Sequence, residues 1–407
     1  MTKKLKILCA PANEGGCSYY RVIAPMQKLQ ELYGDQVEIR YNLNPLGIVE
    51  EAGPTQGGWQ ENWDFADMKW ADIIWTNNIS NWGGPYTARI VGKAKEFGKF
   101  VHFDTDDLLT DLYEGHRLYQ VYKDRDLENI TKFIYSHSDL VTVTQRKFAE
   151  RIKPFCGGVL AIVKNAIDYN LPAWNVPKSR PARKLLRVGW AGGIHHEEDV
   201  KEFAGVPHLV NGRVGRENVH WGFYGAPAQA GGQKGEEWQH EVWRNYRKIL
   251  LSGFKGAANW QIYNALSPDS YGGLYSNVDI SIAPLQMNEF NDSKSEIKVA
   301  ECGRYKIPLI ASDVGCYDET IVNGKTGYLL PPSAPKSDWI KVLTKCLKNP
   351  KHVREMGENL HKITEEYFDL NKVVKHRLEL YSEALGLLHQ DNPDAKVTYN
   401  TEWTFNE

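Results

Sequence analysis

The chain has 407 residues, 42% of them hydrophobic and 25% charged, and its formal net charge is -2 at pH 7. This length favours two domains over a single core. The near-neutral charge argues against non-specific nucleic-acid binding as the main activity, although a local basic groove stays compatible with it. The basic N-terminal start is followed by an apolar run too short for a signal peptide or a membrane span, so we expect neither export nor membrane insertion.

The first half of the chain alternates short apolar segments with segments of helix length. The predicted strands are 5–10, 72–76, 99–103 and 139–143, and a helix is predicted from about Tyr20 to Leu32. Such alternation is typical of a parallel sheet with helices on both faces.

A glycine-containing loop follows the first predicted strand. Gly15 and Gly16 stand where ligands bind in open α/β sheets. Tyr20 and Arg21 begin the next helix, and Arg21 could contact a phosphate or an acceptor. The dinucleotide pattern G-x-G-x-x-G is absent. The alternative is that Tyr20 and Arg21 only cap and staple the helix.

Three carboxylates, Asp104, Asp106 and Asp107, follow the strand 99–103. Clustered carboxylates are costly unless they bind cations, hydroxyls or N–H groups, which favours a functional role for them. A metal-binding D-x-D reading is rejected, because the phosphate-binding pattern lies in the other half of the chain. We expect His102 to be packed on the opposite face of this strand, since neighbouring side chains alternate.

The stretch 164–184 carries Pro172, Pro177 and Pro181 without apolar periodicity and predicts a linker. Within it, Asn165 and Asp168 are expected to form turns at a domain hinge.

The second half repeats the alternation of the first. Its predicted strands are 185–193, 219–225, 278–285 and 307–312, and two charged helical patterns run from 350 to 388. We therefore predict an α/β fold of two Rossmann-like, doubly wound domains that face a cleft. The expected bounds are a first domain 1–165, a linker 166–184, a second domain 185–370, and a helix that crosses back with a polar tail, 371–407.

Paired glycines end the first strand of the second half. Gly192 and Gly193 have no side chains that would keep their N–H groups from a phosphate, and a helix is expected to begin near His196. The alternative is an ordinary tight turn between a strand and a helix.

The segment 288–310 places a turn rich in Ser and Lys at the start of a predicted helix. The first N–H groups of a helix lack partners and the helix dipole is positive there, so this turn predicts an anion site. Lys294 and Lys298 are spaced i,i+4, which would put them on one helix face with Glu301. Phosphate-binding groups beside a carboxylate that accepts hydroxyls indicate a nucleotide sugar. The alternative is an ordinary solvated charged face.

This segment resembles the donor-binding signature of the family-4, GT-B type glycosyltransferases (glycosyl transferases group 1), in the subgroup with FN-x-x-KS-x-x-K-x-x-E before G-x-x-x-x-P. Ser293 stands where the larger family usually has a Glu. Elements similar to this subgroup also occur as G-x-x-x-YR at 16–21, as D-x-DD at 104–107, and as W-x-G-G-x-x-H-x-x-D at 190–199, with His196 and Asp199. The signature residues are Phe290, Asn291, Lys294, Ser295, Lys298, Glu301, Gly303 and Pro308.

The resemblance implies a retaining glycosyltransferase that takes a nucleoside-diphosphate sugar as co-substrate and needs neither a cofactor nor a metal. It implies that the acceptor enters from the first domain, near Gly15, Gly16, Tyr20 and Arg21. Which of Asp104, Asp106 and Asp107 faces the sugar is left open. The donor-binding residues it implies are Gly192, Gly193, His196, Ser293, Lys294, Ser295, Lys298 and Glu301, with Glu301 on the ribose.

Alternatives from other classes remain at this point. A sugar-nucleotide 2-epimerase shares the architecture but would be expected to place acid/base His and carboxylates around the sugar. A non-catalytic binding module would need no lysines that bind phosphate. The acceptor is open between a glycan, a protein and a hydroxymethylated DNA base. A DNA acceptor would need a basic face, for which the candidates are Lys123, Arg125, Lys132, Arg146, Lys147 and Arg151.

The six cysteines show no close metal-ligand pair, which is typical of reduced thiols and predicts a cytoplasmic location. They are Cys9, Cys17, Cys156, Cys302, Cys316 and Cys346.

Overall fold

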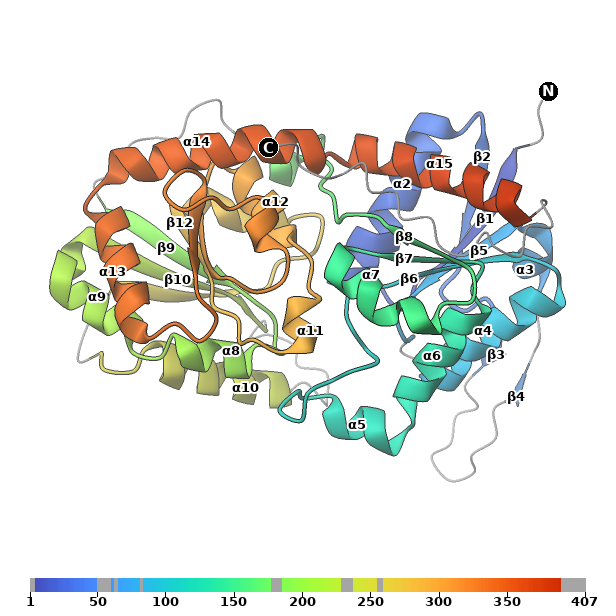
Figure 1. Cartoon of the computed structure of the whole chain (residues 1–407), viewed down its shortest axis with the longest axis horizontal. Helices are drawn as coiled ribbons and strands as arrows, with labels where there is room; N and C mark the ends of the chain where they lie inside the picture. Colours follow the sequence, from blue (N-terminus) through green and yellow to red (C-terminus); the bar gives the residue numbers. More distant parts are fainter. Residues whose placement is uncertain are drawn as a thin grey trace.

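The computed structural model describes residues 4–49, 60–61, 65–80, 83–176, 185–227, 237–254 and 259–388. Two domains lie side by side, and each contains a parallel six-stranded sheet flanked by helices (Figure 1). The predicted fold class, two Rossmann-like domains, is confirmed. The end of the predicted linker, 177–184, and the predicted tail, 389–407, lie outside the described residues. Among the described helices, none is both long and apolar enough to cross a membrane.

The first domain has the strand order β2-β1-β5-β6-β7-β8. These strands are β2 (Val37–Tyr41), β1 (Leu5–Ala10), β5 (Ile73–Asn77), β6 (Phe100–Asp104), β7 (Leu140–Val143) and β8 (Val159–Ile162). Separately, β3 (Ile48–Val49) pairs antiparallel with β4 (Gln60–Glu61). Its helices are α1 (Gly16–Ser18), the π-helix η1 (Tyr19–Ile23), α2 (Ala24–Tyr33), α3 (Ala66–Trp70), α4 (Gly84–Glu96), α5 (Tyr119–Asp124), α6 (Leu127–His137), α7 (Arg146–Ile152) and η2 (Lys153–Phe155).

The second domain has the strand order β11-β10-β9-β12-β13-β14. These strands are β9 (Leu186–Ala191), β10 (Val219–Ala226), β11 (Trp260–Asn264), β12 (Ile280–Ala283), β13 (Leu309–Ser312) and β14 (Gly327–Leu330). Its helices are η3 (Pro172–Trp174), α8 (Glu197–Glu202), α9 (Val206–Val214), η4 (Arg216–Asn218), α10 (Glu237–Leu250), η5 (Tyr271–Asn277), α11 (Glu289–Asp292), α12 (Ile297–Arg304), η6 (Tyr317–Glu319), α13 (Lys336–Leu347) and α14 (Pro350–Tyr367).

Both faces of each sheet are buried, which explains why the strands are apolar at successive positions. In β1, Ile7 and Cys9 belong to one apolar cluster and Leu8 to the cluster on the opposite face. The strand order reverses between β1 and β5 in the first domain and between β9 and β12 in the second. Ligands of open α/β sheets bind at such switch points, beyond the carboxyl ends of the strands.

The chain crosses between the domains twice, at adjacent places. The Ile167 N–H donates to the Phe368 carbonyl (2.9 Å), and the Leu370 N–H donates back to the Ile167 carbonyl (3.0 Å). After this pair, α15 (Leu370–Leu388) packs on the first domain beside α2. Figure 1 shows α14 and α15 running in succession over the second and then the first domain.

A buried ion-pair network fixes α15 to β6. Asp104 is fully buried, and its carboxylate accepts from Arg21 Nε (2.5 Å), Arg377 Nη1 (2.8 Å) and Thr142 Oγ1 (2.8 Å). Burial raises the pKa of Asp104, but the two guanidinium groups outweigh burial and hold the pKa below its usual value. His102 is packed, as predicted, but the prediction that it lies on the opposite face from Asp104 is wrong. The two side chains are two residues apart in a strand, and both contact Thr142.

Replacing Asp104 with alanine is expected to lower the free energy of unfolding by about 3–5 kcal/mol, because two buried guanidinium groups would lose their counter-charge. Urea unfolding measures this change. Asp106→Ala is the control and is expected to change the free energy by less than about 1 kcal/mol. Equal, small losses in both variants would contradict the buried network.

Candidate active site

The turn before α12 leaves several backbone donors unused. The N–H groups of the four consecutive residues 295–298 have no partner within the described part of the chain. Glu296 precedes α12 but does not cap it, because its buried carboxylate accepts instead from Lys164 Nζ (2.6 Å) and Cys316 Sγ (2.8 Å). Free N–H groups at a helix start bind anions, so this turn fits a phosphate.

The predicted helix starts later than the spacing of its lysines suggested. Lys294 and Ser295 lie in the turn between α11 and α12, and the helix begins at Ile297. The i,i+4 argument for Lys294 and Lys298 is therefore wrong. Lys298 and Glu301 do lie on α12, and Glu301 partly offsets the lowering of the Lys298 pKa that burial causes.

Lys298 brings the start of α12 to the switch point of the second domain. Its Nζ donates to the carbonyl of Ala191, at the end of β9 and next to the paired glycines. The Gly192 N–H is already taken by the Tyr224 carbonyl (3.1 Å), and a Cβ on Gly192 would lie only 2.4 Å from the ring of Trp190. Gly192 therefore serves packing. Gly193 is exposed, and its N–H has no partner among the described residues.

The carboxylate of Glu301 is shared between the domains. It accepts from Tyr275 Oη of its own domain (2.6 Å) and from Tyr20 Oη of the first domain (3.1 Å). Burial raises the pKa of Glu301, while Lys298 and the two hydroxyls oppose this shift. Burial and the nearby Glu301 raise the pKa of Tyr20, so its hydroxyl stays protonated and donates. Tyr20 is thus more than a helix cap.

His196 and Asp199 follow the glycine turn in the chain and hold it by hydrogen bonds. His196 Nδ1 lies 2.7 Å from the buried carboxylate of Asp199, whose other oxygen accepts from the Gln286 N–H and from Asn291 Nδ2, both at 2.9 Å. Asp199 therefore ties α8 to the loop that follows β12. This position orients the turn and does not require His196 to contact a ligand.

Ser293 does not face the cleft. It is fully buried, and its hydroxyl donates to the Glu289 carbonyl (2.8 Å) and accepts from Arg151 Nη1 of the first domain (3.0 Å). The neighbouring Asp292 accepts from Arg151 Nη2 (2.8 Å) and Lys147 Nζ (3.0 Å). The structure therefore corrects its assignment as a donor-binding residue: Ser293 belongs to the contact between α7 and the second domain.

Arg21 also lies elsewhere than predicted. It is fully buried and, besides Asp104, its Nη1 donates to the Val163 carbonyl (2.7 Å) and to Asn165 Oδ1 (3.0 Å). Asn165 Nδ2 in turn donates to Ser295 Oγ (2.9 Å). Neither Arg21 nor Asp104 reaches a ligand. Instead, they support a chain of hydrogen bonds that ends at the turn before α12.

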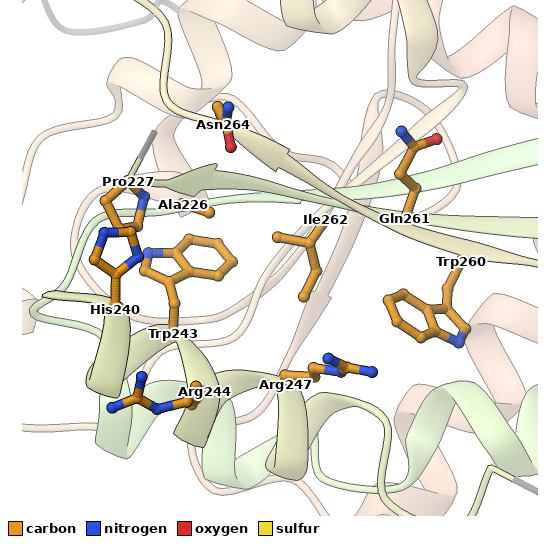
Figure 2. A pocket seen from close by; sticks show the side chains of 10 residues that line it. All are labelled: Ala226, Pro227, His240, Trp243, Arg244, Arg247, Trp260, Gln261, Ile262 and Asn264. Atoms are coloured by element: carbon orange, nitrogen blue, oxygen red, sulfur yellow. The ribbon is translucent and has the colours of Figure 1, made fainter. Parts of the chain in front are cut away.

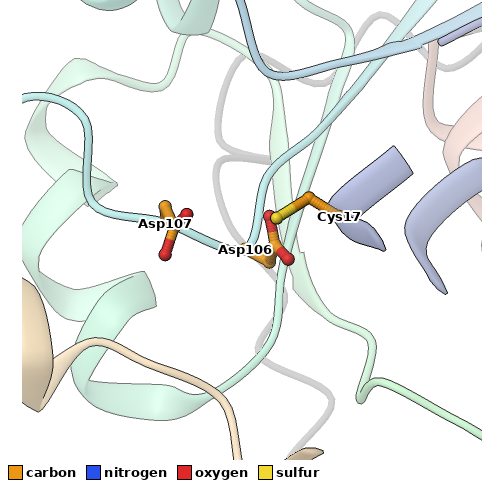
Figure 3. A group of neighbouring side chains, drawn as sticks. All are labelled: Cys17, Asp106 and Asp107. Carbon is orange, nitrogen blue, oxygen red and sulfur yellow. The ribbon is translucent and has the colours of Figure 1, made fainter. Parts of the chain in front are cut away.

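The first domain presents a small acidic cluster at the carboxyl end of its sheet. The ligand atoms of Cys17, Asp106 and Asp107 lie within 4.8 Å of one another (Figure 3), and no second group of this kind occurs in the described part of the chain. Burial and the neighbouring Asp107 raise the pKa of Asp106 to about 6. The exposed Gly15 and Gly16 precede this cluster, with the Gly15 N–H bonded to Asn13 Oδ1 (2.8 Å).

Two histidines meet across the domains. His116, in the loop after β6, stacks on His195 with ring centroids 5.5 Å apart and an interplanar angle of 11°. Burial, the opposite imidazole and Lys294 lower the pKa of His116 to about 4, and burial is also the main reason that the pKa of His195 falls to about 4. Lys294 lies 4.6 Å from the ring centre of Phe290, which also contacts His116. Sequence reasoning missed His116, because no motif marks it.

Solved structures share this arrangement over nearly the whole chain. Sucrose-phosphate synthase from Thermosynechococcus elongatus is 15% identical with a TM-score of 0.64, covering 95% of this chain and 100% of that one. HepE from Anabaena, in complex with UDP and glucose, is 13% identical with a TM-score of 0.58, covering 93% and 99%. The trehalose-6-phosphate synthase OtsA is 10% identical with a TM-score of 0.59, covering 96% and 100%. These likenesses show the fold.

Residues 245–363 match the family described as glycosyl transferases group 1. No curated protein matches the chain by sequence. The matched segment runs from α10 into α14 and includes the whole turn at α12. The chain thus has the two-domain GT-B type fold, and one segment of its second domain matches a glycosyltransferase family. More particularly, that family is the glycosyl transferases group 1, and the matched segment contains Lys294, Lys298 and Glu301.

Tyr20→Phe removes one hydroxyl and with it the hydrogen bond to Glu301. Hydrogen bonds to charged groups contribute about 1.5–3 kcal/mol, so we expect the free energy of unfolding to fall by about that amount. Tyr19→Phe is the matched control, since the Tyr19 hydroxyl has no partner among the described residues. Urea unfolding of both variants tests this. No difference between them would show that the Tyr20–Glu301 contact does not hold the domains.

Acid is expected to destabilise the folded protein between pH 6.5 and pH 4. His116 and His195 stay neutral in the folded state down to about pH 4, whereas in the unfolded chain they take up protons near their ordinary pKa of 6.5. The unfolded state then binds more protons, so stability falls as pH falls across this window. Urea midpoints measured against pH should fall less steeply in His116→Phe/His195→Phe. An unchanged slope would contradict the assignment.

Proposed function

We propose that the protein transfers a sugar from a nucleoside-diphosphate sugar to a hydroxyl group of an acceptor. One observation carries this proposal: the N–H groups of residues 295–298, which have no partner among the described residues, lie together with the Lys298 ammonium and the Glu301 carboxylate at the switch point of the second domain. Lys294 lies in the same turn. The N–H and ammonium groups can bind a diphosphate, and the carboxylate can accept hydrogen bonds from ribose hydroxyls. A non-catalytic binder would not need the acidic cluster of the first domain.

The reaction follows from where charge develops. When the bond between sugar and phosphate breaks, negative charge grows on the leaving diphosphate. Donors already aimed at that position stabilise it without reorganising. In this proposal, the N–H groups at the start of α12, the Gly193 N–H and Lys294 stabilise that charge. These groups would make a metal unnecessary. Retention of the anomeric configuration is part of the proposal and rests on the family resemblance.

The acceptor side is proposed to be the first domain. Gly16, Cys17, Asp106 and Asp107 lie at the carboxyl end of its sheet. Carboxylates there can accept hydrogen bonds from an acceptor hydroxyl. Asp106 and Asp107 are favoured over Asp104, because both oxygens of Asp104 are taken inside the core.

A glycan or protein acceptor is favoured over a modified DNA base. DNA binding needs cations that are free to contact phosphates. Five of the six candidate cations are instead paired with carboxylates: Lys123 and Lys132 with Glu128, Arg146 with Glu150, and Lys147 and Arg151 with Asp292. We also propose a cytoplasmic location, which the six free thiols support.

The first test is a panel of UDP-, GDP-, ADP- and dTDP-sugars incubated with the full chain, with released nucleoside diphosphate measured in the absence of acceptor. UDP-glucose heads the panel, because HepE was solved with UDP and glucose. We expect slow hydrolysis of one donor. Lys294→Ala should reduce it by about 100-fold, the typical loss when one donor to a developing anion is removed. Lys325→Ala, an exposed lysine of the same domain, should not.

Two outcomes would overturn parts of this proposal. If no donor is bound or hydrolysed, the donor site is wrong. If EDTA abolishes the hydrolysis, the metal-free mechanism is wrong, and the cluster of Cys17, Asp106 and Asp107 becomes the place to look for the cation.

A further inference from the structure

A cavity lies in the second domain, away from the switch point. It has a volume of about 540 Å³ and lies between one face of α10 and the edge strand β11 (Figure 2). Because β11 is separated from β9 by β10, this cavity is distinct from the turn at α12. We call it the α10 cavity. Its volume falls in the range of small-molecule sites.

The residues of α10 that line the cavity follow helical spacing. His240, Trp243, Arg244 and Arg247 recur at i, i+3, i+4 and i+7, so they share one face of the helix. The inner face of α10 is apolar, with Val242, Trp243, Tyr246 and Leu250 buried against the sheet. His240, Arg244 and Arg247 lie at its flank, and Figure 2 shows the two arginine side chains extending to opposite sides.

The two arginines have no acidic partner among the described residues. Arg244 and Arg247 are exposed, and neither forms an ion pair with any described residue. Arg247 lies over the ring of Trp260 on β11, with its guanidinium carbon 5.3 Å from the ring centre. Unpaired guanidinium groups bind carboxylate or phosphate oxygens through charge-assisted hydrogen bonds. The cavity is therefore suited to an anion.

The aromatic residues indicate what carries that anion. Trp243 is only 5% exposed, yet its indole N–H is buried without a hydrogen-bond partner in the described structure. A buried donor without a partner costs free energy, which an incoming oxygen would recover. Trp260, opposite, adds a second indole, and Gln261 and Asn264 add amide groups. Indole faces pack against the C–H faces of sugar rings, and amides bind hydroxyl groups.

We propose that the α10 cavity binds an anionic saccharide, with a sugar ring against Trp260 and its carboxylate or phosphate on Arg244 or Arg247. This site is separate from the donor site and does not rest on the proposed transfer reaction. Trp243 also packs against Trp190, whose ring lies beside the glycine turn after β9. Trp243 and Trp190 therefore connect the lining of the cavity to the glycine turn of the proposed donor site.

The test is a titration of the full chain, without donor, followed by tryptophan fluorescence and calorimetry. The probes are digalacturonate, its neutral counterpart galactobiose, glucose 6-phosphate and inorganic phosphate. We expect the anionic sugars to bind and to change the fluorescence, and we expect the neutral disaccharide to bind at least about tenfold more weakly. Digalacturonate and glucose 6-phosphate together separate carboxylate from phosphate as the recognised group.

Arg244→Gln/Arg247→Gln should weaken binding of the anionic sugars by about tenfold or more. Lys248→Gln is the matched control, a nearby exposed cation of α10 that does not line the cavity, and should leave binding within about twofold. Circular dichroism checks that both variants fold. Equal binding of the neutral disaccharide, equal binding of inorganic phosphate, tighter binding of an oligonucleotide to the same arginines, or no binding at all would each overturn the proposal.

Discussion

The candidate site depends on one constraint: the turn from Asp292 to Lys298 must be held firmly while the N–H groups of residues 295–298 keep no partner in the described structure. Helix starts are usually satisfied by a side chain of the turn itself, which would occupy those donors. Here the turn is held from outside. Arg151 and Lys147 of α7 bind Asp292, Asn165 binds Ser295, and Lys164 binds Glu296. All four of these residues belong to the first domain or the hinge, so the domain interface itself prepares the anion site.

Residues of both domains therefore determine the geometry of the proposed donor site. The glycine turn, α12 and Glu301 belong to the second domain, but Tyr20 contacts Glu301 from the first. A ribose that binds Glu301 must share the carboxylate with the Tyr20 hydroxyl or replace it. If the proposed donor site is correct, binding of a nucleotide would be linked to the contact between the two domains through this single carboxylate.

Buried ion pairs supply the rigidity behind the interface. Desolvating charges costs free energy, so such pairs are weak evidence for stability on their own. Their value here is geometric. Arg377 of α15 and Arg21 of η1 share Asp104, and Arg21 reaches Asn165 at the hinge. The helix that returns to the first domain is thereby connected, through side chains, to the turn before α12.

The features predicted correctly from the sequence are those that hydrophobic periodicity and residue spacing determine. The interior strands of both sheets were recognised, because both of their faces are covered. The four edge strands, β2, β8, β11 and β14, were missed. Residues of β2 and β11 are largely exposed or half-buried, and β8 and β14 are runs of only four residues. Lys298 and Glu301 were placed correctly on one helix. Ser293, Arg21 and Asp104 were misplaced, because a polar residue at the end of a strand or in a turn has the same local pattern whether it meets a ligand or a partner in the other domain. His116 and His195 came together only through the tertiary fold.

The most direct measurement is hydrogen–deuterium exchange of the full chain with and without UDP, and with GDP, ADP and dTDP in parallel. The amides of residues 295–298 have no partner in the described structure, so they should exchange rapidly alone. We predict that one nucleoside diphosphate slows exchange at these amides and at Gly193, while α6 of the first domain stays unchanged. Exchange that no nucleotide alters at residues 295–298, or protection confined to the loop after β1, would contradict the assignment of the donor site.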